Sequence, residues 1–334
     1  MLATLEGLPG LFIGHWTDAE AATGCTVLLF PRGAAAGVDV RGSAPGTRET
    51  AVLTAGNLVD RIHAVLLTGG SAYGLDAASG VMAWCEEQGV GFETPAGRVP
   101  IVVAAVLYDL DLGDPSRRPG PAEGRAACRA ATSSHPASAA TMLGNVGAGA
   151  GATVGKRAGP AHRMKGGLGV AWGRLASGEA MAAVVAVNAV GDVVDPRTGE
   201  WLAGAYDRER RRPLPEWGAT ASPPLGPGQA TTLACVVTAL PVEGPDLTKV
   251  ATMSHDGIAR AVRPSHTLFD GDAVFAGSVG EGPRYGGLPR AVAVSQAGAL
   301  AADLVTEAIV AAVRSARGVA GVPSMSDIRA AQTR

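Results

Sequence analysis

The sequence has few aromatic residues, almost no excess charge and few cysteines, and each shortage excludes a class of protein. Aromatic side chains make up 4% of the 334 residues and hydrophobic side chains 47%. The core is therefore expected to consist of Ala, Val, Leu and Gly. The net charge of −2 provides no basic surface, which argues against binding to nucleic acid or to an anionic membrane. A small or neutral molecule is the expected partner.

The cysteines and histidines lack the spacings of disulfide frameworks and metal sites. The four cysteines form no CxxC pair, which predicts reduced core residues of a cytoplasmic protein. The six histidines show neither HExxH nor HxH spacing, so no metal site is predicted. These residues are Cys25, Cys85, Cys128 and Cys235, and His15, His63, His135, His162, His255 and His266.

The sequence also lacks a targeting segment and a membrane span. The N-terminus has neither the basic head nor the long apolar stretch of a signal peptide. No run reaches the roughly 18 uncharged apolar residues that a membrane span needs, because Gln296, Asp303 and Glu307 interrupt the longest candidate, residues 291–313. We expect a soluble, cytoplasmic, single domain spanning residues 1–334.

The periodicity of the apolar residues predicts a mixed α/β chain. Residues 10–40 alternate short apolar runs with Gly and Pro turns, which is typical of β-hairpins. Elsewhere, buried strands alternate with amphipathic helices. The expected strands are 62–68, 99–108, 167–172, 180–189 and 231–240, and the expected helices are 75–88, 122–131, 247–262 and 291–317.

A glycine-rich stretch, residues 144–156, falls short of both nucleotide-binding motifs. In the phosphate-loop pattern GxxxxGK, Ala150 stands in the place of the first glycine, and Arg157 replaces the Ser or Thr that binds the metal. The dinucleotide fingerprint needs a preceding strand and an acidic residue about twenty positions later, and neither is present. No cofactor is predicted.

The most informative stretch begins at Thr231. Residues 201–230 are rich in Pro, Gly and Arg and predict an exposed linker, after which paired threonines lead directly into a β-branched apolar run. If the bond before Thr231 were cut, this residue would carry a hydroxyl nucleophile beside an α-amine with a pKa of about 7.7 to 8. Such an amine can act as the base in an N-terminal-nucleophile hydrolase. The alternative is a strand that begins with two threonines.

Two carboxylates precede the last predicted strand. Asp270 and Asp272 flank Gly271 and can converge on one group if the backbone turns there. Carboxylates this close raise each other's pKa, so a nearby ammonium would be needed to keep both ionised. The alternative is a solvated turn. A serine triad at Ser278 is excluded, because no histidine lies beyond His266 to complete the order Ser, Asp, His.

Five stretches, in the same order over nearly the whole chain, closely resemble the L-aminopeptidase/D-esterase family, which includes β-peptidyl aminopeptidases and nylon-oligomer (6-aminohexanoate oligomer) hydrolases. The resemblance implies a four-layer αββα sandwich and a precursor that cuts itself into chains 1–230 and 231–334. It also implies an N-terminal Thr or Ser nucleophile, no metal or cofactor, and a homo-oligomer, a tetramer of processed pairs. The stretches are residues 69–78, 147–152, 231–232, 255–260 and 269–276.

The resemblance also implies a role for individual residues. Thr231 takes the place of the nucleophile, with Asp270 and Asp272 as the carboxylate pair of the nylon-oligomer branch. Asn188 resembles the amide that orients the substrate or binds the oxyanion, and Tyr108 the tyrosine near the substrate. The lysine is either Lys156, by its distance from the glycine loop, or Lys165, by its Lys-Gly-Gly context; we favour Lys156.

One position departs from the family, in which Asn or Gly often precedes the nucleophile, whereas here the residue is Ala230. Self-cleavage depends more on backbone strain and an oxyanion donor than on the side chain of residue 230. Without self-cleavage, the α-amine of Thr231 never forms. The expected activity is hydrolysis of a small peptide, amino-acid amide or nylon-type oligomer. Two alternatives remain open: an acyltransferase of the ornithine-acetyltransferase kind, and an uncleaved binding protein without activity.

Overall fold

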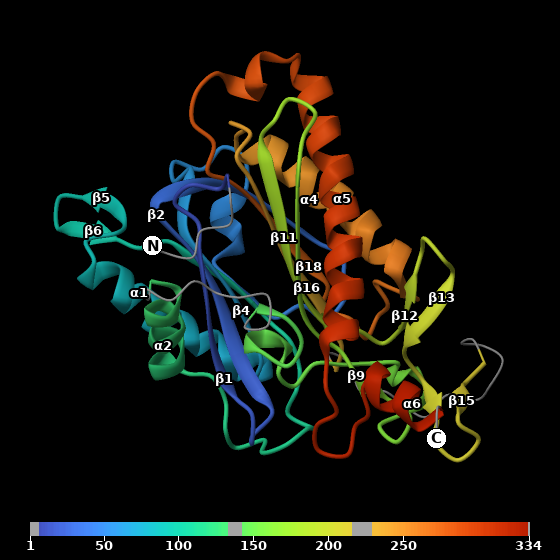
Figure 1. Cartoon of the computed structure of the whole chain (residues 1–334). Coiled ribbons are helices and arrows are strands. Elements are labelled where there is room, and N and C mark those ends of the chain that lie inside the picture. The colour runs from blue at the N-terminus through green and yellow to red at the C-terminus, as the bar shows by residue number, and fades with distance from the viewer. Residues whose placement is uncertain (1–6, 133–141, 216–228, 333–334) are drawn as a thin grey trace.

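The computed structural model describes residues 7–132, 142–215 and 229–332 (Figure 1). Its main sheet has nine strands in the order β10-β11-β16-β18-β2-β4-β7-β3, with β1 paired to β2. The long strand β2 joins two halves, because its C-terminal part pairs with β18 and its N-terminal part with β1 and β4. The strands are β1 (Phe12–Asp18), β2 (Thr23–Val40), β3 (Thr47–Arg48), β4 (Arg61–Thr68), β7 (Val102–Val106), β10 (Gly167–Arg174), β11 (Ala180–Asn188), β16 (Thr231–Thr238) and β18 (Ala273–Ser278).

Helices cover the outer faces of both halves of the sheet. Helices α1 (Ala77–Glu87) and α2 (Pro121–Ala131) lie together on one side, and α4 (Gly244–Ala261) and α5 (Arg290–Ser315) on the other (Figure 1). The short helix α6 (Met325–Gln332) follows α5. All four helices that the periodicity predicts are present, and each boundary lies within three residues of its expected position.

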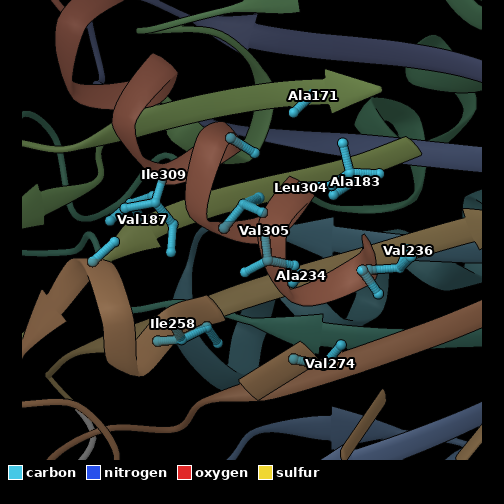
Figure 2. Close-up of a cluster of buried hydrophobic side chains, with 14 of the residues drawn as sticks. Ala171, Ala183, Val187, Ala234, Val236, Ile258, Val274, Leu304, Val305 and Ile309 are labelled. Carbon is cyan, nitrogen blue, oxygen red and sulfur yellow. The ribbon is translucent and has the colours of Figure 1, made fainter. Parts of the chain in front are cut away.

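Alternation along the strands divides the apolar residues into three core layers. In β16, Ala234 and Val236 face α4 and α5, while Leu233, Cys235 and Val237 face the other half of the sheet. Figure 2 shows the first of these layers, in which strand side chains meet Ile258 of α4 and Leu304, Val305 and Ile309 of α5. A third layer lies beneath α1 and α2. The predicted αββα sandwich is confirmed.

Helix α5 is the one helix in the described parts of the chain that is long and apolar enough to cross a membrane. Its most apolar window is 61% buried inside the protein. It packs on α4, β10 and β11 through small residues such as Ala301, Ala308 and Ala312. The four cysteines are all free and buried in the same core layers.

The segment expected to be an exposed linker, residues 201–230, is exposed at residues 208–213, as expected, but residues 202–206 are buried. Leu202, Ala203 and Ala205 are fully buried. The buried carboxylate of Asp192 explains why these residues are buried. It accepts hydrogen bonds from the Arg157 guanidinium, the Trp201 indole and the backbone N–H of Ala205. Residues 216–228 lie outside the described parts of the chain.

Short strand pairs complete the fold around these segments. Strand β12 (Asp192–Asp195) pairs with β13 (Glu200–Ala203) and with β17 (Val262–Arg263). The other pairs are β5 (Phe92–Thr94) with β6 (Gly97–Val99), β8 (Thr153–Val154) with β9 (Met164–Lys165), and β14 (Tyr206–Asp207) with β15 (Arg212–Pro213).

Candidate active site

Three chain segments meet at the start of β16. Strand β11 is antiparallel to β16, so its last residue, Asn188, lies directly opposite Thr231. Strand β18 is parallel to β16, so the residues just before β18 lie beside the start of β16, where Ala230 pairs with Asp270. The pairing of the strands therefore brings together the predicted nucleophile, the predicted amide and the predicted carboxylates.

Two donors surround the carbonyl group before Thr231. The Ala230 oxygen accepts a hydrogen bond from the Thr231 hydroxyl at 2.5 Å and another from the Gly271 backbone N–H at 2.9 Å. Both Ala230 and Thr231 are buried, with 0% and 2% of their surface exposed. The chain thus covers its own candidate nucleophile while the 230–231 bond is intact.

Gly271 is a residue of the site that the sequence analysis treated only as a turn. A Cβ atom here would lie 2.7 Å from the Ala44 oxygen and 2.9 Å from the Thr231 hydroxyl. Only glycine therefore lets this backbone approach Thr231 closely enough to present its N–H to the Ala230 carbonyl. The position of a glycine between two candidate carboxylates was the signal in the sequence.

Lys156 lies in the same cluster. Its Nζ donates to Asn188 Oδ1 at 2.6 Å, to the Asn188 backbone oxygen at 2.9 Å and to the Gln229 oxygen at 2.7 Å. Burial lowers the pKa of this lysine to about 7, so near neutral pH it can hold or release a proton. The glycine loop positions it, since Gly155 packs against the Gly204 backbone with a φ of +73° that favours glycine.

Asn188 connects this lysine to the residues on its other side. Its Oδ1 also accepts the Thr153 backbone N–H at 2.9 Å, and its Nδ2 donates to the Tyr108 backbone oxygen at 2.9 Å. The side chain of Tyr108 is partly buried, and burial together with the nearby Asp111 carboxylate raises its pKa. Tyr108 thus reaches the cluster through its backbone.

Lys165 occupies a different environment. Its Nζ donates to the backbone oxygens of Ala150 and Ala152, at 2.9 and 2.6 Å, beneath the glycine loop. Its charged neighbour is Asp109, whose carboxylate accepts the Thr23 hydroxyl and the Gly70 N–H. The structure therefore brings Lys156, and not Lys165, to the segment that precedes Thr231.

The two carboxylates are buried, with 1% of each residue exposed, but they do not converge on one group. Asp270 accepts the Val190 N–H and both the N–H and hydroxyl of Thr267. Asp272 accepts the Thr232 N–H at 2.6 Å and two donors from His266. Burial, and then repulsion from Asp272, raise the pKa of Asp270. The alternative of a solvated turn is thus wrong, because backbone and side-chain donors surround both buried carboxylates.

His266 and Thr267 are further residues of this cluster, and the sequence alone identified neither of them as a site residue. No spacing motif connects His266 to Thr231. The only signal was its position four and six residues before the two aspartates. The turn between β17 and β18 brings it back to Asp272.

The remaining candidates lie away from Thr231. The Ser278 hydroxyl donates to the Leu240 oxygen, and this serine pairs with Thr238 at the far end of β16. A cavity of about 550 Å³, lined in part by Ile62, Val242 and Ser278, is found at that same far end. Within the described ranges, no group of three or more His, Cys, Asp or Glu residues is arranged to hold a metal ion.

Comparison with known proteins identifies relatives over nearly the full length of the chain. The model of peptidase family S58 matches residues 4–326. A Mycobacterium leprae (strain TN) protein described as an uncharacterized aminopeptidase is 40% identical, over 96% of this chain and 92% of its own. A 6-aminohexanoate-oligomer endohydrolase of Kocuria sp. (strain KY2) is 32% identical, over 92% of this chain and 84% of its own.

Two solved structures share the fold. A Burkholderia sp. beta-aminopeptidase superposes with a TM-score of 0.66 at 20% identity, covering 100% of this chain and 95% of its own. The L-aminopeptidase D-Ala-esterase/amidase of Ochrobactrum anthropi gives a TM-score of 0.69 at 18% identity, covering 98% and 92%. That structure is described as a new variant of the Ntn hydrolase fold, which agrees with the αββα arrangement of this chain.

Proposed function

Because the chain belongs to peptidase family S58, we propose that it is an amide hydrolase that processes itself and then uses Thr231 as an N-terminal nucleophile. The observation that carries this proposal is the Ala230 carbonyl, which contacts both the Thr231 hydroxyl and the Gly271 N–H. A nucleophile and an oxyanion donor thus lie on either side of one buried peptide bond.

The first step is self-cleavage. The Thr231 Oγ forms a bond to the Ala230 carbonyl carbon, the bond from that carbon to the Thr231 nitrogen breaks, and the hydroxyl proton passes to this nitrogen. The Gly271 N–H stabilises the negative charge on the Ala230 oxygen during attack. Water then hydrolyses the resulting ester and leaves a carboxylate on Ala230 and a free amine on Thr231.

Cleavage also opens the site. In the intact chain Ala230 and Thr231 are buried, and Lys156 holds the Gln229 oxygen. Once the bond is cut, residues 229–230 can leave, and the space they vacate beside Thr231 becomes available to a substrate carbonyl. The oxygen of that carbonyl would occupy the position of the Ala230 oxygen, next to Gly271.

In turnover the Thr231 amine accepts the proton of its own hydroxyl as that hydroxyl attacks the substrate. Lys156, whose pKa burial lowers to about 7, stabilises the neutral amine by its charge. Asp272 holds the backbone N–H of Thr232, the residue after Thr231, and Asp270 holds the backbone N–H of Val190, two residues after Asn188. The amine of the substrate leaves with the transferred proton, and water hydrolyses the ester on Thr231. Asn188 orients Lys156 and contributes to binding the oxyanion.

The names of the relatives suggest the substrates. Aminopeptidases and a 6-aminohexanoate-oligomer endohydrolase both cleave amide bonds, so we propose small peptides, amino-acid amides or nylon-type oligomers as substrates. A screen of amino-acid p-nitroanilides against 6-aminohexanoate oligomers distinguishes these classes. We also propose that the protein is cytoplasmic and forms a homo-oligomer of processed pairs.

The decisive experiment compares wild type with Thr231→Ala by intact mass and by amide hydrolysis. We expect wild type to separate into residues 1–230 and 231–334, and the variant to remain one inactive chain. Thr232→Ala is the matched control, because Thr232 lies one residue farther along the same strand; it should still be cut at the same bond. An uncut wild type with full activity would refute the proposal.

A further inference from the structure

His266 lies in the loop between β17 and β18 and makes two hydrogen bonds to one oxygen of Asp272. Its Nδ1 lies 2.7 Å from Asp272 Oδ2, and its backbone N–H donates to the same oxygen at 3.0 Å. The other carboxylate oxygen accepts the Thr232 backbone N–H at 2.6 Å. Asp272 therefore connects His266 to the residue that follows the candidate nucleophile.

The backbone of His266 adopts a conformation that most residues avoid. Its φ is +56°, in the left-handed region, which residues other than glycine adopt infrequently, Asn, Asp and His more often than the rest. Such conformations persist where surrounding contacts stabilise them. The two hydrogen bonds to Asp272 are the contacts that hold this one.

The ring of His255, in α4, packs against the imidazole of His266. The two rings meet edge to face, with their centroids 4.8 Å apart and an angle of 74° between their planes. The Nε2 of His255 lies 3.0 Å from the Asp39 backbone oxygen. A carbonyl oxygen can only accept, so this nitrogen of His255 carries the hydrogen.

The protonation state of His255 follows from its surroundings. Burial lowers the pKa of His255; the hydrogen bond to Asp39 opposes this shift, and His266 and Arg41 add to it. His255 is therefore neutral at neutral pH. In the described part of the chain, His266 Nε2 and His255 Nδ1 are buried without a hydrogen-bond partner, so the imidazole of His266 makes its hydrogen bond to the site through Nδ1.

We propose that His266 is a positioning residue for the reaction, which orients the Asp272 carboxylate against the start of β16 while His255 holds the His266 ring. This inference rests on the proposed function, because the benefit of a fixed Asp272 appears once Thr231 has a free amine that must be aligned for attack. A shift of the carboxylate would move the Thr232 N–H, and with it the adjacent Thr231.

Substitutions at His266 distinguish the effect of its side-chain hydrogen-bond donor from the effect of its backbone conformation. His266→Asn places an amide N–H near the position of Nδ1 and tolerates a positive φ, whereas His266→Gln keeps the polarity but moves the donor one bond farther out. His266→Gly tolerates the backbone conformation and removes the side-chain donor. His63→Ala is the control, because His63 is also buried and hydrogen-bonded, to the Ile101 N–H, at the start of β4.

The measurements are intact mass, kcat and KM on an amino-acid p-nitroanilide, and the thermal unfolding midpoint, all on the purified processed enzyme. We expect His266→Asn to keep kcat within about threefold, and His266→Gln and His266→Gly to lower it by tenfold or more, since small misplacements of a reacting group have effects up to about 100-fold. KM should change little in all three. His63→Ala should lower the midpoint without changing kcat.

Two results would overturn the inference: His266→Gly with the kcat of wild type, or His266→Asn and His266→Gln with equal losses. If His266→Gly does not fold, the Asn and Gln pair decides alone. These outcomes are distinct from failure of the proposed function, which would appear as an uncut active wild type or an active Thr231→Ala. A cut wild type, an inactive Thr231→Ala and an unaffected His266→Gly would reject the positioning role and leave the nucleophile in place.

Discussion

The two buried lysines of this protein have similarly lowered pKa values but different hydrogen-bond partners. Burial lowers the pKa of both Lys156 and Lys165 to about 7. Lys156 donates to Asn188 and to the Gln229 oxygen, two residues before Thr231. Lys165 donates to backbone oxygens of the glycine loop, at Ala150 and Ala152.

The comparison shows that a lowered pKa is not enough to identify a residue of the reaction. Desolvation acts on any buried ammonium, whatever its task. The hydrogen-bond partners distinguish the two lysines, because one set belongs to the chain around the proposed nucleophile and the other to a packed loop. Lys165 has a structural explanation: it satisfies carbonyl groups that the close glycine packing leaves buried.

The largest effect should come from Lys156. In Lys156→Met the Gln229 oxygen and Asn188 Oδ1 lose a charged donor, and the Thr231 amine loses the nearby cation. We expect kcat to fall about 1000-fold or more and self-cleavage, followed by intact mass, to slow. Lys165→Met is the matched control and should change kcat of the processed, folded enzyme by less than about threefold. Equal losses of kcat in the two variants would contradict the different roles assigned to Lys156 and Lys165.

A smaller effect is expected from Asn188. Asn188→Ala removes one acceptor of Lys156 and the donor to the Tyr108 oxygen, and removal of an oxyanion donor typically lowers kcat about 100-fold or more. The circular dichroism spectrum should still show a folded protein. Asn145→Ala is the control, since Asn145 makes two backbone hydrogen bonds to Arg317, away from Thr231. A kcat unchanged in Asn188→Ala would exclude this side chain from the site.

The smallest effect is expected at Lys165. It concerns the pH dependence of the free energy of unfolding. In the unfolded chain a lysine binds a proton at pH values below about 10.4. In the folded protein Lys165 binds one only at pH values below about 7. Between these values the unfolded state holds the extra proton, so the free energy of unfolding increases with pH.

Lys165→Met should remove this increase and lower the slope by up to about 1.4 kcal/mol per pH unit. Urea unfolding between pH 7.5 and 9.5 measures the slope, in a Thr231→Ala background that keeps the chain in one piece. An unchanged slope would mean that Lys165 is protonated in the folded state throughout this range.

Much of the fold could be predicted from the sequence, because local periodicity reflects burial directly. The continuous apolar run that follows Thr231 and Thr232 predicts a buried strand, and the apolar spacing in residues 291–317 predicts the long helix α5. Residues 201–206 were misjudged as exposed. Their order depends on the Asp192 carboxylate and Arg157, which no pattern in residues 201–206 could indicate.

For the site, the sequence by itself determined the candidates: a threonine at the start of a buried strand, two aspartates around a glycine, an amide and two lysines. Only the tertiary structure decided their partners. It placed Lys156 beside Gln229, separated the two carboxylates, and brought Gly271 and His266 to β16. The physical reason is that hydrogen bonds act over about 3 Å, and strand pairing between distant segments sets which groups come that close.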